Sequence, residues 1–183
     1  ELLSATGEWC AGSIRNRAEE LDTKGAGEVI DGKTVPSPAL EAFYQEAKEL
    51  EVFGANGPKE YGGMDLPMSM GMIVLAQISR ACIPSCMQMS FYGCISDMLD
   101  RFASKEIKDK YIPEIIAGNI SGSMCLTEPG CGSDLGSLST SATPQEDGSY
   151  LLNGSKIFIT NGGGGLGLIL ARVDGAPEGL GGI

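Results

Sequence analysis

The 183-residue sequence contains no histidine. This absence excludes Ser-His-Asp and Cys-His catalysis, imidazole metal ligands and the usual proton carrier near neutral pH. Basic side chains are also few: 13 Lys and Arg stand against 24 Asp and Glu, for a formal net charge of −11. A surface with this balance opposes binding to polyanions, so we expect no nucleic-acid partner. Any chemistry in this chain must use other side chains or a cofactor.

Cysteines with metal-binding or redox spacing are missing as well. None of the six is part of a CxxC pair, and a chain of this length can bury a core without disulfides. We therefore expect free, mostly buried thiols and a reducing compartment. The six are Cys10, Cys82, Cys86, Cys94, Cys125 and Cys131.

Long hydrophobic runs are absent. The longest apolar-leaning run, residues 68–78, is shorter than the about 20 residues that a membrane-spanning helix needs. The first residues also lack a basic stretch that leads into an apolar core. We expect no membrane span and no export signal, and a location in the cytoplasm, or in the mitochondrial matrix if the source is eukaryotic.

The glycines divide the chain into two parts: 12 lie in residues 1–121 and 15 in residues 122–183. Helical periodicity dominates the first part, and Ser37 before Pro38 predicts a helix N-cap, with Gly54 as the stop. Pro113 is expected to bend or restart the last helix of this part. Helices are predicted from about Trp9 to Leu21 and over residues 38–50, 67–80, 85–102 and 104–118.

Short runs rich in β-favouring residues follow, separated by turn signals at residues 146–149 and at Asn153-Gly154. Strands are predicted over residues 137–143, 150–152, 156–160 and 168–173. The fold class is therefore α+β, with an all-helical domain over residues 1–121 and an antiparallel β domain over residues 122–183. Because an apolar strand begins as the chain stops, we expect this chain to be a fragment of a larger protein.

Two segments carry most of the information about function. Residues 124–134 read Met-Cys-Leu-Thr-Glu-Pro-Gly-Cys-Gly-Ser-Asp, and residues 158–163 read Phe-Ile-Thr-Asn-Gly-Gly. The first is a strand that runs into a turn, where the hydroxyls of Thr127 and Ser133 and free backbone amides can bind a polar ring edge or a phosphate. On spacing alone a purely structural turn is favoured, and the function stays open.

Three weaker patterns favour structural interpretations. Residues 162–167 formally contain GxGxxG, but a strand is expected after them where a dinucleotide motif needs a helix, so we predict a flexible hairpin loop. Glu128 and Asp134 are interpreted as turn or cap residues without a catalytic role. The methionines of one stretch are more typical of core than of an acyl cavity. These are Met68, Met70, Met72, Met87 and Met89.

Taken together, the segments resemble the acyl-CoA dehydrogenase family over nearly the whole chain. The matching pieces are Pro58-Lys-Glu-Tyr-Gly-Gly, Lys110-Tyr-Ile-Pro, Leu126-Thr-Glu-Pro-Gly-Cys-Gly-Ser-Asp, Asn153-Gly-Ser-Lys-Ile-Phe-Ile-Thr-Asn-Gly and Leu170-Ala-Arg. Asp31-Gly-Lys and Ala176-Pro-Glu-Gly resemble the longer members, which include methylthiopropanoyl-CoA dehydrogenases.

The resemblance implies an N-terminal helical domain, a central antiparallel β-barrel domain that is truncated here, and a C-terminal helical domain absent from this chain. It implies FAD as cofactor and the α,β-dehydrogenation of an acyl-CoA thioester to a 2-enoyl-CoA. The base in most of the family is a Glu of the C-terminal domain, so no catalytic residue is expected in this segment. An electron-transfer flavoprotein is the implied electron acceptor, and a homodimer or homotetramer the implied assembly.

The resemblance also assigns residues by position. The implied flavin contacts are Met124, Leu126, Thr127, Gly132, Ser133, Phe158, Ile159 and Thr160. Ser133 would also meet the acyl-CoA, and the candidates for the acyl pocket are Met87, Ser90 and Phe91. The family often has Trp at the position of Phe158 and a small residue at Cys131; the first change keeps an apolar face, and the second concerns only local packing.

Two alternatives share these motifs. An acyl-CoA oxidase would pass electrons from the flavin to oxygen, and fast reoxidation by oxygen would distinguish it. A flavin-containing DNA-binding protein of the alkylation-response branch is disfavoured by the acidity of this segment.

Overall fold

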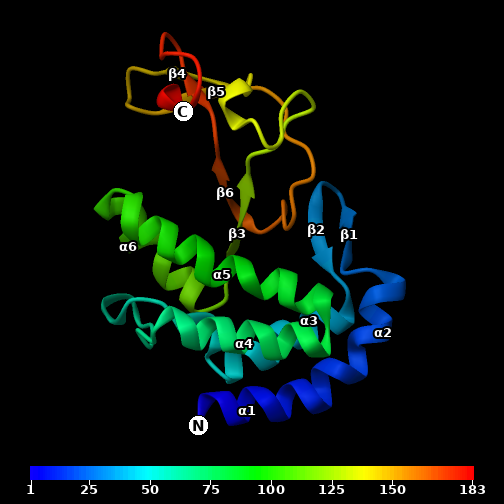
Figure 1. The fold of residues 1–183 in the computed structure, drawn as a ribbon. Coiled ribbons are helices and arrows are strands. Elements are labelled where there is room, and N and C mark those ends of the chain that lie inside the picture. Colours follow the sequence, from blue (N-terminus) through cyan, green and yellow to red (C-terminus); the bar gives the residue numbers. More distant parts are fainter. The chain divides into compact units, whose positions relative to one another are not determined.

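Two groups of residues, each with its own interior, make up the structure, which is a computed structural model that describes residues 1–183 (Figure 1). Unit 1 comprises Glu1–Gly122 and Gly163–Gly165, and unit 2 comprises Ser123–Gly162 and Leu166–Ile183. The two units are described separately below.

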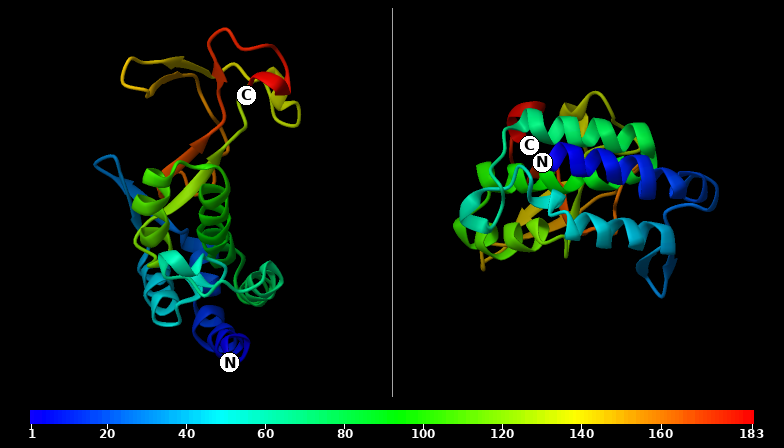
Figure 2. Two further views of the ribbon diagram at one scale, coloured as in Figure 1. Left: turned by 90° about the vertical axis from the view of Figure 1, so that its left-hand side faces the viewer. Right: turned by 90° about the horizontal axis from the view of Figure 1, so that it is seen from below.

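Unit 1 is mainly helical, as the apolar periodicity predicts. Its helices are α1 (Leu2–Trp9), α2 (Arg15–Lys24), α3 (Pro38–Glu49), α4 (Met68–Ala81), α5 (Ile83–Phe102) and α6 (Lys105–Ile116), with short 3₁₀ turns at Val52–Gly54 and Lys59–Tyr61. Helix α4 lies beside both α1 and α5, and α5 also packs on α6 (Figures 1 and 2). The expected N-terminal helical domain is thereby confirmed. No helix combines the length and the apolar character needed to cross a bilayer.

Local capping chemistry sets two of the helix starts. The Oγ of Ser37 accepts a hydrogen bond from the amide of Leu40 at 3.3 Å, and the Oγ of Ser104 accepts one from the amide of Ile107 at 3.4 Å. Pro113 does not restart the last helix, because α6 continues through it to Ile116.

The predicted stop at Gly54 is wrong. Helix α3 ends at Glu49, and Glu51 adopts the left-handed conformation with φ 55°. This turn directs Val52 and Phe53 into the interior, where they are 2% and 3% exposed, so burial of two apolar side chains ends the helix earlier than the glycine would.

A π-helical segment, Cys10–Ile14, joins α1 to α2, so the predicted first helix starts earlier and is less regular than expected. The interior of unit 1 is formed by aromatic and aliphatic side chains from α1, α3, α4 and α5. Trp9 stacks on Phe43 of α3 with ring centroids 5.1 Å apart, and Ile78 of α4 and Ile95 of α5 are fully buried. This aromatic and aliphatic core holds the helices together.

The first part of the chain is not all-helical, because it contains a β-hairpin that was not predicted. Strands β1 (Gly27–Ile30) and β2 (Lys33–Pro36) pair antiparallel around Asp31-Gly32. Both turn residues have positive φ, 50° and 75°, which is the requirement of a tight hairpin turn and the reason for Asp-Gly there. An Asp-Gly pair between Glu28-Val29-Ile30 and Thr34-Val35 was the available signal.

The second part of the chain carries the remaining strands. They are β3 (Ser121–Cys125), β4 (Ser141–Pro144), β5 (Tyr150–Asn153), β6 (Gly165–Ile169) and β7 (Arg172–Val173), with 3₁₀ turns at Leu135–Ser137 and Leu180–Gly182. β3 pairs with β6, and β4 lies between β5 and β7 in a three-stranded sheet. The predicted turn at residues 146–149 joins β4 to β5 and is closed by a hydrogen bond from the Gln145 amide to the Ser149 carbonyl at 2.9 Å.

Several strand predictions need correction. Residues 156–160 form no strand, since Phe158 and Asn161 both take φ 57°, which interrupts an extended chain. The predicted strand at 137–143 begins only at Ser141, and that at 168–173 is broken between Ile169 and Arg172. The β4–β7 pair is parallel, so the sheet is not purely antiparallel. No closed barrel forms, because β5 and β7 remain the edges of their sheet.

The structure agrees better with the predictions of free cysteines and of a loop at the glycine-rich segment. All six thiols are free, as expected, although only Cys10, Cys82 and Cys131 are buried and Cys94 is exposed. The residues around Gly162 form a turn followed by β6, which excludes the helix of a dinucleotide motif.

Candidate functional site

The carboxylate of Glu128 is the centre of the loop region in unit 2. Glu128 is 3% exposed. One of its oxygens accepts hydrogen bonds from the amide and the hydroxyl of Ser139, both at 2.7 Å. The other accepts from the amide of Thr140 at 3.0 Å and from Nζ of Lys156 at 2.8 Å. A buried carboxylate with this many donors is fully satisfied.

Lys156 lies two residues before the second of the segments singled out in the sequence and connects it to the first. Besides its ion pair with Glu128, its Nζ donates to the carbonyl of Leu126 at 3.1 Å. The next residue, Ile157, donates its amide to the carbonyl of Thr127 at 2.9 Å. The structure therefore brings the Leu126–Thr127 part of the first motif against the start of the second.

The surroundings of Glu128 favour its charged form. Burial alone would raise the pKa of Glu128, but the hydrogen bonds from Lys156, Thr140 and Ser139 outweigh it and hold the pKa well below its usual range. A carboxylate held in this way cannot act as a base near neutral pH, which agrees with the absence of a predicted catalytic role. Glu128 is nevertheless more than a turn residue, because it joins three segments.

The turn after Glu128 leaves the next part of the motif open to solvent. Glu128 and Cys131 exchange backbone hydrogen bonds of 2.9 and 3.2 Å, and Cys131 is buried while Gly132 and Ser133 are exposed. Asp134 stands at the N-cap position of the 3₁₀ turn Leu135–Ser137 but makes no side-chain cap hydrogen bond; its carboxylate accepts instead from the Ser137 hydroxyl at 2.5 Å. The exposed Gly132-Ser133 backbone can thus approach a ligand.

Phe158 is the most conspicuous side chain of the second motif. It is 87% exposed in spite of its apolar ring, and its left-handed backbone turns the chain at this point. Ile159 is half-buried and Thr160 is exposed. The Thr127 and Thr160 hydroxyls have no hydrogen-bond partner among the protein's groups, so both are available to a bound molecule. Met124 and Leu126, on the other segment, are half-buried.

The predicted substrate residues lie on α5, in unit 1. Ser90 lines a cavity of about 250 Å³ between α4 and α5, together with apolar side chains that include Leu75 and Met89. Met87 is 44% exposed and Phe91 partly exposed, and neither lines this cavity. The core interpretation of the methionines holds for Met89 but is wrong for others: Met68 and Met72 are half exposed and line the same cavity.

Two protein-family models match the chain. The family model described as "Acyl-CoA dehydrogenase, N-terminal domain" matches residues 1–119, and the one described as "Acyl-CoA dehydrogenase, middle domain" matches residues 123–181. The chain belongs to the acyl-CoA dehydrogenase family. The family expected from the motifs is thereby confirmed.

Individual relatives agree with the family. The chain is 34% identical over 192 residues to 3-methylmercaptopropionyl-CoA dehydrogenase of Ruegeria pomeroyi. This match covers 99% of the present chain and 32% of the relative. It is 36% identical over 140 residues to mitochondrial isobutyryl-CoA dehydrogenase of Dictyostelium discoideum, with 76% and 33% covered. The chain thus spans about a third of the length of these curated relatives.

A solved structure shows the same fold. The crystal structure of acyl-CoA dehydrogenase complexed with FAD from Bacillus anthracis superposes with a TM-score of 0.79 at 27% identity and covers 95% of this chain and 28% of that one. In the present chain, no group of three or more Cys, Asp or Glu side chains is placed to hold a metal ion.

Sequence reasoning missed the Glu128–Lys156 pair. The two residues are 28 positions apart, and the contact has no periodic signature. The signal that could have suggested it is chemical: the first motif carries only acidic charges, Glu128 and Asp134, and Lys156 is the only charged residue of the piece Asn153–Gly162.

Proposed function

We propose that this chain is part of an FAD-dependent acyl-CoA dehydrogenase, which converts an acyl-CoA thioester into a 2-enoyl-CoA. The observation that carries the proposal is the joining of the two motif segments by Lys156 and Ile157. It gathers in one unit the segments that carry two unpartnered hydroxyls and an exposed aromatic ring, which is a chemistry suited to a flavin.

The residues present fit FAD. The hydroxyls of Thr127 and Thr160 would hydrogen-bond the polar edge of the ring system, and Phe158 would cover an apolar face and exclude water. The rest of the proposed site consists of Met124, Leu126, Gly132, Ser133 and Ile159. FAD, when bound, supplies the acceptor for the hydride that leaves the β-carbon of the substrate.

On the substrate side, Ser133 would contact the acyl-CoA, and α5 would contribute to the acyl pocket through Ser90, with Met87 and Phe91 as further candidates. Ser90 is the best supported of the three, because it lines the cavity between α4 and α5. No residue of this chain is assigned as the base that removes the α-proton, and Glu128 is excluded by its depressed pKa.

The same proposal covers organisation and partners. Residues 1–121 would form the N-terminal helical domain and residues 122–183 the first part of a β-barrel domain, with a C-terminal helical domain outside this chain. The compartment would be the cytoplasm or the mitochondrial matrix, and the assembly a homodimer or homotetramer. The electron acceptor would be an electron-transfer flavoprotein.

Anaerobic mixing of the purified full-length protein with a series of acyl-CoA thioesters tests the proposal. We expect flavin absorbance that is bleached by one or more thioesters and restored quickly by electron-transfer flavoprotein but slowly by oxygen. Rapid reoxidation by oxygen would indicate an oxidase instead. A protein without flavin, or with flavin that no thioester reduces, would refute the proposal.

Thr160→Ala tests the placement of the flavin. Loss of one hydrogen bond, worth about 0.5–1.5 kcal/mol, should weaken FAD binding several-fold or shift the flavin spectrum. The matched control is Thr143→Ala, because Thr143 is also exposed but its hydroxyl donates to Asp174 at 2.6 Å, away from both motifs. An unchanged spectrum, affinity and reduction rate in Thr160→Ala would contradict this placement.

A further inference from the structure

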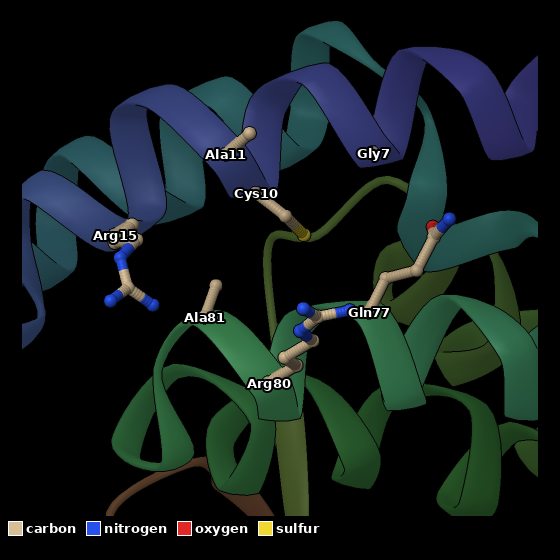
Figure 3. A pocket seen from close by; sticks show the side chains of 7 residues that line it. All are labelled: Gly7, Cys10, Ala11, Arg15, Gln77, Arg80 and Ala81. Carbon is tan, nitrogen blue, oxygen red and sulfur yellow. The ribbon is translucent and has the colours of Figure 1, made fainter.

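A second cavity lies in unit 1, between α4 and the helical segment formed by α1 and the π-helical turns (Figure 3). Its volume is about 360 Å³, which is within the range of small-molecule sites. None of its residues belongs to the proposed flavin or acyl contacts. They are Gly7, Cys10, Ala11, Arg15, Gln77, Arg80 and Ala81.

Two arginines give this cavity a charge opposite to that of the chain as a whole. Arg15 and Arg80 come from the two facing elements, and Figure 3 shows both side chains extending into the space between them. Neither side chain forms an ion pair or a hydrogen bond. Glu19 and Asp22 line an adjoining cavity that shares Arg80, but no acidic side chain lines this one. Two free guanidinium groups in a chain of net charge −11 are an unusual local excess of positive charge.

The other walls provide room and one unused acceptor. Gly7, Ala11 and Ala81 have no side chain long enough to fill the space. The amide nitrogen of Gln77 donates to the Leu3 carbonyl at 3.2 Å, whereas its Oε1 is buried without a partner. Because this oxygen is shielded from solvent, the ligand contacts are assigned to the arginines alone.

The thiol of Cys10 does not oppose an anion here. It is 6% exposed, and burial raises its pKa to about 11, so it stays protonated and neutral at physiological pH. Cys10 and Ala11 also belong to the π-helical segment Cys10–Ile14, which directly precedes Arg15. Such segments are rare and occur frequently at functional sites.

We propose that this cavity binds a small ligand that carries a phosphate group. The phosphate oxygens accept hydrogen bonds from the Arg15 and Arg80 guanidinium groups, which suit this geometry. A phosphate offers more oxygens to the two guanidinium groups than a simple carboxylate does, so a carboxylate is a poorer match.

Calorimetric titration of the full-length, flavin-loaded protein at constant ionic strength tests the proposal. The two probes are inorganic phosphate and glycerol 3-phosphate, and chloride is the reference anion. We expect saturable binding of at least one probe and none of chloride. Tighter binding of glycerol 3-phosphate identifies an organic phosphate as the ligand class, and tighter binding of inorganic phosphate identifies the free anion.

Arg15→Gln and Arg80→Gln should each weaken the binding about tenfold or more, because each removes charge-assisted hydrogen bonds. The matched control is Arg101→Gln on α5, which removes an exposed arginine that is already paired with Asp97 and should leave the affinity unchanged. Gln77→Glu should also weaken binding, by placing a carboxylate where the orphaned oxygen lies.

Three results would overturn the proposal. The first is no saturable binding of either probe to the full-length protein. The second is equal affinity in wild type, Arg15→Gln and Arg80→Gln, and the third is an equal loss in Arg101→Gln. Since both arginines are exposed and unpaired, their variants are expected to fold, and an unchanged melting temperature in the absence of phosphate verifies this.

Discussion

Glu128 shows, at the scale of single residues, how this chain keeps a loop region in place without a strand ladder. Residues 126–128 and 156–157 pair through only one backbone hydrogen bond, from Ile157 to Thr127. The remaining connections come from Nζ of Lys156, which donates to the Leu126 carbonyl and forms an ion pair with Glu128. The side chains of this pair, Glu128 and Lys156, are 2% and 10% exposed. A buried ion pair adds little stability compared with an apolar pair, but it tolerates few alternative geometries. Its value here is that it fixes which segment lies against which.

Removal of this charge leads to the first prediction for a single residue. Glu128→Gln leaves the buried Lys156 ammonium without its counter-ion, and breaking such a pair costs about 3–5 kcal/mol. We therefore expect a clear fall in the melting temperature of the full-length protein and a lower FAD content. Asp97→Asn is the control, because it breaks an exposed ion pair with Arg101, which contributes about 0.3–0.5 kcal/mol. Equal melting temperatures for both variants would contradict the role given to Glu128.

The same residue predicts a pH dependence with a definite sign. The pKa of Glu128 in the folded protein is depressed below its unfolded value of about 4.3. Its contribution to stability is therefore complete above that unfolded value and is lost as the pH falls toward the folded one. Urea denaturation between pH 3 and pH 7 should show the difference between wild type and Glu128→Gln narrowing below about pH 4. A constant difference over this range would mean that the charge of Glu128 is not the cause.

Replacement of Phe158 is expected to change FAD affinity without changing the stability of the flavin-free protein. Because its ring is 87% exposed, Phe158→Ala removes little buried surface and should leave the melting temperature of the flavin-free protein unchanged. If the ring covers the flavin, FAD affinity should fall about tenfold. Phe102→Ala is the matched control, since Phe102 is 77% exposed on α5 and has no proposed contact with FAD. Equal FAD affinity in the two variants would remove Phe158 from the site.

Which residues could be predicted from sequence depended on the range of their interactions. Ser37 was predicted as a cap because its acceptor role involves an amide only three residues away. Glu51 was missed because its left-handed conformation depends on the burial of Val52 and Phe53. Glu128 was assigned to a turn because its partners lie 11, 12 and 28 residues away, beyond any local pattern.

At the scale of elements, helices could be predicted more fully than strands, because helices depend on local interactions and strands on distant partners. A helix satisfies its backbone within itself, so apolar periodicity was enough to predict α5 and α6, and periodicity with a cap predicted α3. A strand needs a partner, and residues 156–160 remain unpaired although their composition favours β structure. The β1–β2 hairpin is the reverse case, because its partner is adjacent and the Asp31-Gly32 turn was a readable local signal.

The cavity between α4 and α5 allows a prediction about these elements. Ser90 lines it, and its hydroxyl donates to the Met87 carbonyl of the same helix at 2.8 Å, so Ser90→Leu costs no tertiary hydrogen bond. If the cavity holds the acyl chain, the larger side chain should exclude longer substrates by about 1–3 kcal/mol per displaced methylene. The measurement is kcat/KM over a series of acyl-CoA lengths, with FAD content unchanged.

Met98→Leu is the control for this cavity, because Met98 lies on the same helix, does not line the cavity and is not among the proposed substrate contacts. Its chain-length preference should equal that of the wild type. A uniform loss of kcat/KM for all substrates in Ser90→Leu, together with a lower melting temperature, would identify Ser90 as a packing position and remove α5 from the acyl site.

At the scale of the whole molecule, the chain carries the proposed binding residues without a proposed base. It spans about a third of the length of its relatives. Several large apolar side chains are also exposed, among them Met72 at 57%, Phe102 at 77% and Leu180 at 71%. Apolar surface stabilises a protein only when it is removed from water. We therefore expect other parts of the full-length protein to cover these side chains and so to raise its stability.

The last prediction follows for residues 1–183 produced alone. With much apolar surface uncovered, the segment should melt well below the full-length protein. Because none of its residues is proposed as the base that removes the α-proton, it should also show no acyl-CoA-dependent flavin reduction when FAD is added. Stopped-flow absorbance under anaerobic conditions measures the second point, with the full-length protein at equal FAD occupancy as the control. Reduction by the isolated segment at a rate near that of the full-length protein would place a working base among these residues, and Asp134, whose carboxylate is exposed at the end of the first motif, would then be the first to replace.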